Sequence, residues 1–265
     1  MCSLNLALAE KGELSERMFS FSQQGIQSIY ITWNTTLQSS VLLSDIYFSM
    51  GHIALAQRMA FEANVMMPAP GGPRMLQRLI QTNLIFGAYA VAEKYMDLLA
   101  QTTYYKKWVH EHRRFLWNDE AVAGDELLGM KRSCIPKENF LAENPDLGVD
   151  LEYIARQNPA HLASIQYAGA FLLLSKKTLL FKEFVEQYYG TKVLPALPKS
   201  YQEALIILSE QDPLLLEKYA VSESVIHQYQ ALRQQVLANK GNNAALPGLL
   251  KNSFGHTYWY YYMFK

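Results

Sequence analysis

The stretch LLSDIYFSMGHIALAQRMAFEANVMMP, residues 42–68, decides the fold class. Its first part repeats apolar residues at the spacing of one helical face, namely Leu43, Ile46, Tyr47 and Met50. Gly51 ends that run, and a second periodic run covers residues 53–66 before Pro68. Glycine adopts the left-handed conformation at a helix end without steric cost. The stretch therefore predicts two antiparallel helices joined by a tight turn.

The same helix, glycine, helix unit occurs on both sides of this stretch. Gly87 lies 36 residues after Gly51, and Gly12 lies 39 residues before it. Because one such hairpin cannot bury its apolar faces alone, the repetition predicts a stack, with three hairpins over residues 1–117. Alignment on Gly12 places the start of the first helix before Met1, so we expect the chain to be a piece of a longer parent protein.

The middle unit resembles the tetratricopeptide repeat. The apolar, small, aromatic and turn positions of that repeat correspond in order to Leu43, Ser44, Tyr47, Gly51, Ala56, Ala60, Ala63 and Pro68. Small side chains are needed where two helices approach closely. The third unit matches less well, because Asn83 stands at the tyrosine position and Met96 and Leu99 replace small residues. The resemblance implies a right-handed stack of antiparallel helix pairs.

The second half of the chain carries weaker patterns of the same kind. Residues 118–150 contain several turn formers and predict a connector or insertion with one short helix. Residues 151–246 predict further hairpins, the clearest of which pairs residues 160–174 with residues 178–189. An aromatic tail follows at 247–265. Since no convincing strand pattern occurs, we predict an all-α fold, a superhelical tetratricopeptide-like solenoid.

Four segments carry a second resemblance, to an uncharacterised Bacteroidales family of large membrane proteins. They are NLALAEKGELSERMF (5–19), NPAHLASIQYAGAFLLL (158–174), LPKSYQEALI (197–206) and HTYWYYYMF (256–264). In that family, hydrophobic spans precede a soluble helical-repeat tail. The resemblance implies a membrane-anchored parent in the bacterial cell envelope and leaves the side of the membrane open. It transfers no catalytic residue, because the family has no assigned activity.

Composition and motifs exclude several function classes. Lys plus Arg and Asp plus Glu both number 24, so the chain lacks the net positive charge typical of nucleic-acid binders. Cys2 and Cys134 match no metal or redox spacing. The apolar stretch at 167–174 is far shorter than the roughly 20 residues of a membrane span. Nucleophile, phosphate and dinucleotide motifs do not occur, so no cofactor, metal or small-molecule ligand is indicated and an enzyme is disfavoured.

Protein or peptide binding is the function that the predicted stack favours. Such a stack presents a concave surface made by the first helix of each pair. The predicted outward positions on that surface are Ser40, Asp45, Ser49, Gln77, Gln81 and Asn83. We therefore expect a non-catalytic interaction or scaffold region.

A basic segment at residues 104–117 is a candidate anion patch, formed by Lys107, His110, Arg113 and Arg114. His110 and His112 point about 200° apart on a helix and cannot share a metal. The alternative interpretation is a solvated helical face, balanced by the nearby acidic residues Asp119, Glu120, Asp125 and Glu126.

The tail FGHTYWYYYMFK, residues 254–265, concentrates aromatic side chains that need a partner surface, among them Tyr258, Trp259, Tyr261 and Tyr262. Either the tail caps the last hairpin, or it forms a platform for sugars or peptides or an interface with the parent. Two other function classes remain open. One is glycan binding, and the other is an enzyme with a site between the two halves, near His161 or His227.

Overall fold

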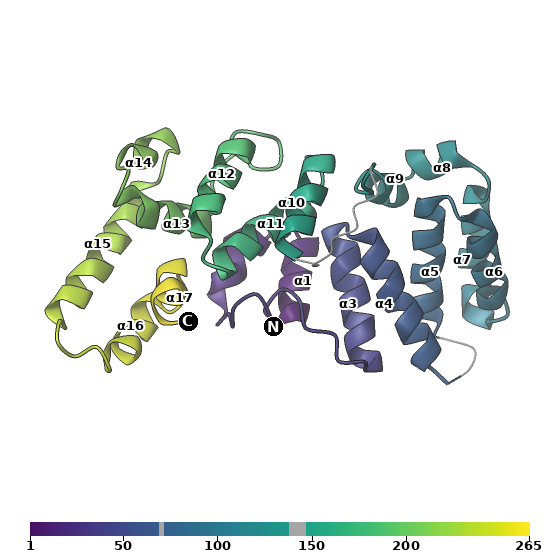
Figure 1. Ribbon diagram of the computed structural model, residues 1–265, viewed down its shortest axis with the longest axis horizontal. Coiled ribbons are helices and arrows are strands. Elements are labelled where there is room, and N and C mark those ends of the chain that lie inside the picture. Colours follow the sequence, from purple (N-terminus) through teal and green to yellow (C-terminus); the bar gives the residue numbers. More distant parts are fainter. Residues whose placement is uncertain (69–71, 138–146) are drawn as a thin grey trace. The chain divides into compact units, whose positions relative to one another are not determined.

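The computed structural model describes residues 1–68, 72–137 and 147–265, and these residues form α-helices and short 3₁₀ helices without a β-strand (Figure 1). The all-α prediction is confirmed. The chain divides into two compact units that we name by their place in the sequence. The central unit comprises Tyr30–Ser164, and the terminal unit comprises Met1–Ile29 together with Ile165–Lys265.

The first four helices of the central unit form two hairpins, which pack in chain order, α3 on α4, α4 on α5 and α5 on α6 (Figure 1). Their bounds are α3 Leu37–Met50, α4 Ile53–Met66, α5 Pro73–Phe86 and α6 Tyr89–Ala100. The predicted turns are confirmed, because Gly51 and Gly87 end α3 and α5 with φ of 86° and 73°. Both angles are left-handed, the region that glycine enters at little cost.

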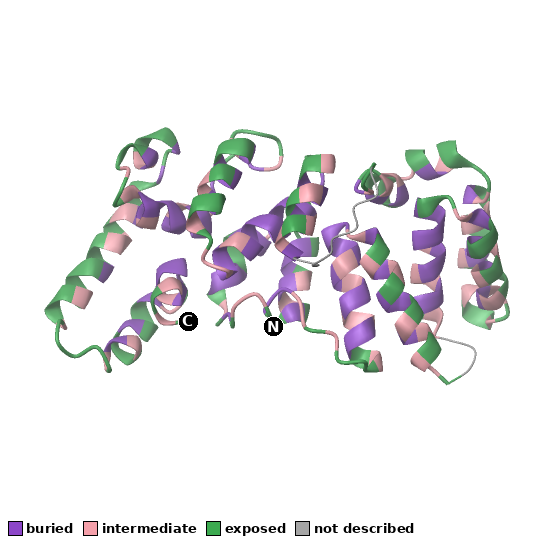
Figure 2. Cartoon of the chain, in the orientation of Figure 1, coloured by how far each residue is buried: buried purple, intermediate pink, exposed green. Residues whose placement is uncertain are grey.

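Small side chains bring α3 and α4 close together. Ser44, Ala56, Ala60 and Ala63 are all fully buried. Figure 2 shows the buried parts of each helix in purple. The Ser44 hydroxyl donates a hydrogen bond to the carbonyl oxygen of Ala56 at 3.0 Å, across the helix pair. A longer side chain at these positions would separate the helices, since interaxial distance depends on the residues at the contact.

Shorter helices complete the central unit, and two of them occupy the predicted connector. They are η2 Thr103–Tyr105, α7 Lys106–His112, η3 Arg113–Phe115, α8 Asp119–Gly124, α9 Glu126–Arg132 and α10 Leu147–Gln157. The connector was expected to hold one short helix, whereas it contains α8 and α9 and the start of α10. Val122 of α8 and Leu128 of α9 are buried in the same hydrophobic core as residues of α5 and α6. Residues 138–146 of the predicted connector lie outside the described residues.

The terminal unit joins the two ends of the sequence. Its elements are α1 Cys2–Glu10, α2 Leu14–Arg17, η1 Met18–Ser20, α12 Thr178–Tyr188, α13 Lys199–Ser209, α14 Leu214–Lys218, α15 Glu223–Ala238, α16 Leu246–Phe254 and α17 Tyr258–Phe264. Helix α11, Leu162–Leu174, begins in the central unit and continues into this one. The predicted pair at 160–174 and 178–189 is confirmed as α11 and α12.

The first predicted hairpin is only partly formed. Its turn at Gly12 has φ of 72°, as expected, but the second helix stops after Arg17 and the chain becomes extended at Phe21. The buried Gln23 side chain donates to the carbonyl oxygens of Met18 and Phe21, which competes with helix continuation. This segment packs on α13, where Ser15 Oγ lies 2.9 Å from Tyr201 Oη. It therefore belongs to the terminal unit, so the predicted boundary at residue 117 does not separate the units.

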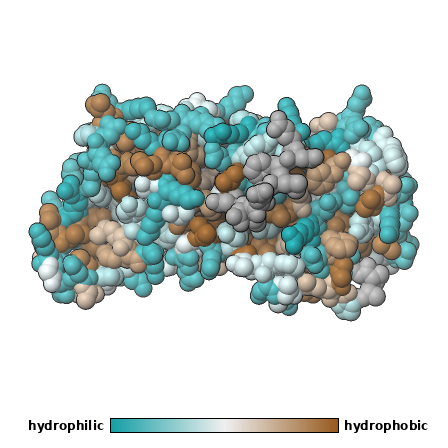
Figure 3. Space-filling model, viewed as in Figure 1, coloured by the Kyte–Doolittle hydropathy of each residue, from teal (hydrophilic) through white to brown (hydrophobic). Residues whose placement is uncertain are grey.

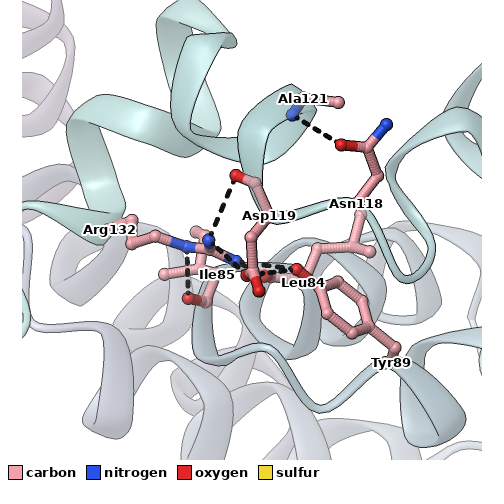
Figure 4. A network of polar contacts seen from close by, with 7 residues as sticks. All are labelled: Leu84, Ile85, Tyr89, Asn118, Asp119, Ala121 and Arg132. Carbon is pink, nitrogen blue, oxygen red and sulfur yellow. Dashed lines mark hydrogen bonds and ion pairs between the residues drawn. The ribbon is translucent and has the colours of Figure 1, made fainter.

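Arg132 at the end of α9 fixes the end of α5 (Figure 4). Its guanidinium donates to the carbonyl oxygens of Leu84 at 2.7 Å and Ile85 at 3.0 Å, in the last turn of the helix, where carbonyl groups lack partners one turn further along. Leu84 also accepts the backbone N–H of Gly87 at 3.1 Å. The Arg132 guanidinium also donates to Asp119 Oδ1 at 2.8 Å, and Tyr89 Oη donates to that oxygen at 2.6 Å. Hydrogen bonds from Tyr89 and Arg132 hold the pKa of Asp119 below its usual value.

Within the described residues, no helix has both the length and the apolar character that crossing a bilayer requires.

The two turn glycines give a matched pair of substitutions. Ala at either site must adopt a left-handed conformation, which costs about 1 kcal/mol. At residue 51 an added Cβ would also lie 3.0 Å from Cys134 Sγ and 3.2 Å from Ile154 Cγ2, whereas nothing lies within 4 Å of one at residue 87. We expect Gly51→Ala to lower the free energy of unfolding by about 2–3 kcal/mol and Gly87→Ala by about 1 kcal/mol. Equal losses in urea unfolding would show that the packing around Gly51 yields freely.

Removal of the Arg132 charge should destabilise the central unit. Arg132→Met keeps the length of the side chain but removes the Arg132 donor from Ile85 and one of the two donors from Leu84, at an expected cost of about 1–3 kcal/mol. Arg156→Met is the control, because Arg156 makes an exposed pair with Glu152 one turn away on α10, worth at most about 0.5 kcal/mol. Thermal unfolding of both variants measures the difference, and similar melting temperatures would contradict the assigned role.

Candidate functional site

The predicted groove residues do not form one exposed polar surface. Ser40 and Ser49 are buried, so their prediction as outward positions is wrong. Trp33 covers Ser40 and donates its indole N–H to the hydroxyl at 2.9 Å. Over Ser49 lies Lys131 of α9, whose Nζ donates to the carbonyl oxygen of that residue at 3.0 Å. The prediction failed because the non-helical segment before α3 and the later helix α9 cover faces that a simple hairpin stack would expose.

The remaining four predicted groove residues are also partly or wholly engaged. Asp45 is tied to α5 by ion pairs with Arg74 and with Arg78, the latter at 3.1 Å. Gln77 and Gln81 are half-buried, and Gln81 accepts a hydrogen bond from Arg78. Asn83 is buried, which contradicts its predicted outward position, and it donates to the carbonyl oxygen of Leu79 at 2.7 Å. Asp45 therefore joins α3 to α5, whereas the hydrogen bonds of Gln81 and Asn83 stay within α5.

An apolar groove does lie on the same hairpins, over different residues. We name it the α4–α6 groove, and it is lined by Ala54, Gln57, Arg58, Phe61, Leu79, Asn83, Val91 and Tyr95. It has a volume of about 350 Å³, and its residues come from α4, α5 and α6. Phe61 is 49% exposed and Val91 is 44% exposed, although both are large apolar side chains. Figure 3 shows hydrophobic residues reaching the surface of the chain between hydrophilic areas.

Carboxylates accompany most cations of the predicted anion patch. Arg113 pairs with Asp97 and, at 3.7 Å, with Glu93, both on α6. Lys107 lies 3.9 Å from Glu111, and Arg114 lies 3.8 Å from Asp125. His110 is exposed. The sequence analysis expected acidic partners only after the patch, whereas Glu93 and Asp97 lie on α6, the helix before it. The geometry favours the solvated, charge-balanced face, and anion binding here stays a prediction.

The aromatic tail forms a core element of the terminal unit. Tyr258, Trp259 and Tyr261 of α17 are buried, and Tyr262 is half-buried. The Trp259 indole donates to the carbonyl oxygen of Glu203 at 2.7 Å, and Tyr261 Oη donates to the carbonyl oxygen of Leu174 at 2.6 Å. With 1% of its surface exposed, Trp259 is not available to stack on a sugar. Of the two interpretations, the structure supports a tail that folds back onto the helices.

Glu203 is an acidic side chain in the core beneath this tail. One carboxylate oxygen accepts the backbone N–H of Tyr258 at 2.6 Å, at the start of α17. The Lys199 ammonium lies 3.8 Å from the other oxygen. The backbone N–H of Lys199 donates to the carboxylate of Glu16. Burial raises the pKa of Glu203 to about 7, against the opposing effects of the Tyr258 hydrogen bond and Lys199. The sequence had offered no signal to separate Glu203 from surface carboxylates.

The two histidines considered as enzymatic groups have different environments. His161 is buried, and its Nε2 lies 2.9 Å from Lys131 Nζ. Burial and the Lys131 charge lower the pKa of His161 to about 3, so its ring is neutral at physiological pH. His227 is exposed on α15. Over the described ranges, no three His, Cys, Asp or Glu side chains come together as metal ligands, and both cysteines are buried as free thiols.

Comparison with known proteins gives one match. The sequence model of the family described as "Family of unknown function (DUF6057)" matches residues 1–265. The chain belongs to this family. For the DUF6057 chain, the comparisons with curated proteins and with solved structures give no match. The expectation of an uncharacterised family is confirmed, while the bacterial group and the membrane-anchored parent stay predictions.

The buried Glu203 predicts a pH-dependent stability for the DUF6057 chain. A pKa of about 7 in the folded state, against an ordinary value of 4.5, means that the folded chain binds this proton more tightly than the unfolded one. The stabilisation is present below pH 4.5 and is lost as the pH rises through 7. Between pH 5 and 8, the free energy of unfolding of the original chain should fall by about 2–3 kcal/mol more than that of Glu203→Gln, because the amide stays neutral.

Glu217→Gln is the control for this measurement, since Glu217 is exposed in the same unit. Urea unfolding at both pH values, followed by circular dichroism, gives the free energies. A Glu203→Gln variant with the same pH dependence as the original chain would contradict the assignment.

Proposed function

We propose that this chain is a protein-binding helical-repeat module, which holds a peptide segment of a partner protein in the α4–α6 groove. The observation that supports the proposal most is the exposure of Phe61 and Val91 over a buried floor that includes Leu79. Val65, one turn after Phe61 on α4, is also exposed and extends the apolar row. Contiguous apolar surface of this kind, bordered by polar groups, is typical of interaction sites.

The polar groups of the groove define the chemistry of the partner. Arg58 is the charged residue among those that line it, and Gln57 and Asn83 supply amide groups. The Arg58 guanidinium lies over the Trp33 ring at 5.6 Å, which restricts its movement. A fitting segment would insert one large apolar or aromatic side chain beside Phe61 and place a carboxylate near Arg58. Helical grooves commonly bind short segments through such anchors.

The architecture of the hairpins supports a tetratricopeptide-like classification within this proposal. The glycine turns and the small buried residues Ser44, Ala56 and Ala60 occupy the positions that this repeat requires. The groove, however, lies between α4 and α6, the second helices of the two pairs, together with α5. Membership of a larger membrane-anchored protein is a further part of the proposal, and it rests on the sequence resemblance alone.

Selection from a random peptide display library tests the proposal, with the purified chain as bait. We expect enriched peptides that contain an aromatic or large aliphatic residue near an acidic one. Their affinity should fall at least tenfold on Phe61→Ser, since a central apolar anchor typically contributes 2 kcal/mol or more. The fall on Arg58→Gln should depend on the acidic residue of the peptide. Fluorescence anisotropy of labelled peptides provides the affinities.

Phe86→Ser is the matched control, because Phe86 is also a phenylalanine of the central unit and is 40% exposed, but it does not line the groove. Its affinity for the selected peptides should equal that of the original chain. Failure to enrich any peptide, or equal losses for Phe61→Ser and Phe86→Ser, would argue against the groove as the binding site.

A further inference from the structure

A second concave site lies in the terminal unit, where the two ends of the sequence meet. It is lined by Phe19, Phe21, Ser22, Gln23, Lys251, Asn252, Gly255, His256, Thr257, Tyr260, Tyr261 and Lys265. All of these residues belong to the terminal unit, so the site does not depend on the central one. Its volume of about 310 Å³ is at the lower end of the range for small-molecule pockets. We name it the terminal pocket.

The wall of the terminal pocket is aromatic and already fixed. The rings of Phe19 and Tyr261 lie against each other with centroids 5.3 Å apart. The Tyr261 hydroxyl is bound to the carbonyl oxygen of Leu174, and Tyr260 Oη donates to the carbonyl oxygen of Pro247 at 3.0 Å. Gln23 is held by Asn5 at 2.9 Å. A ligand would therefore meet a largely preorganised surface, which reduces the entropy lost on binding.

The charged residues of the terminal pocket are of one sign. Lys251 and Lys265 line it together with His256, and no aspartate or glutamate is among the lining residues. This is a local excess of positive charge in a chain whose formal net charge is zero. In the part of the chain that the structure describes, neither lysine pairs with a side-chain carboxylate. The side chains of Lys251, His256 and Lys265 are all exposed, so they can reach a ligand in the pocket.

We infer that the terminal pocket binds a small organic anion with an aromatic body, whose ring packs on the half-buried Phe21 and Tyr260 while its anionic group contacts Lys251 and Lys265. Apolar burial against the rings supplies contact area. The ammonium groups at the partly enclosed rim attract the anion and orient it. Ser22 and Asn252, both exposed, provide further hydrogen-bond donors. The inference stands apart from peptide binding, because the α4–α6 groove lies in the other unit.

Isothermal titration calorimetry with three probes tests this inference on the full chain. Phenylacetate and phenyl phosphate carry the ring and an anionic group, and they distinguish a carboxylate from a phosphate ligand. Phenylacetamide has nearly the same shape as phenylacetate but no charge. We expect saturable binding of at least one anion at one site per chain, weaker at high salt, and no saturable binding of the amide.

Two variants locate the binding. The double substitution Lys251→Gln with Lys265→Gln should weaken anion binding at least tenfold, and Phe21→Ala should weaken it through the loss of ring contact. Lys240→Gln is the control, because Lys240 is an exposed lysine of the same unit outside the pocket. Circular dichroism checks that each variant is folded. Absence of saturable binding by both anions, equal binding of the amide, or unchanged affinity in the double variant would overturn the inference.

Discussion

The close approach of α3 and α4 is the constraint on which the central unit depends. Ser44 faces Ala56 across the pair, and their hydrogen bond satisfies a buried hydroxyl at the point of contact. The left-handed Gly51 and the following His52 are the whole connection between the two helices, so they pack together close to the turn. The next hairpin then packs on α4 and repeats the arrangement. Each hairpin thus provides the apolar surface that its neighbour needs.

Periodicity and turn chemistry were sufficient to predict the fold of the hairpins. Gly51, Gly87 and the pair α11 and α12 follow from local signals, because helix ends are set by residues within a few positions. The shortened second helix after Gly12 could not be predicted in this way. It ends where the Gln23 side chain hydrogen-bonds to backbone carbonyl groups of this segment. The segment also packs on α13, where Ser15 contacts Tyr201, 186 positions later in the sequence.

The candidate sites were harder to predict, because exposure is a property of the whole unit. Ser40 and Ser49 lie on the correct helix but are covered by Trp33 and Lys131, which no helical period relates to them. The aromatic residues of α17 were recognised as needing a partner, but only the structure identifies Glu203 and Leu174 as that partner. The two concave sites combine segments from separate elements, so their residues share no common motif.

The discontinuity of the terminal unit has a consequence for the order in which the chain folds during synthesis. Residues Tyr30–Ser164 are complete in the nascent chain long before α17 is made, so the central unit can fold while the terminal one still lacks its last helices. Its folded state shortens the loop that must close when Ser15 meets Tyr201, and the entropic cost of that closure is lower than for an unfolded loop of the same length. Until α17 emerges, Glu203 on α13 lacks the backbone N–H of Tyr258 that it binds in the folded chain, and the aromatic residues of α17 do not yet cover it. The helices of the terminal unit that are made first would then expose apolar surface to chaperones.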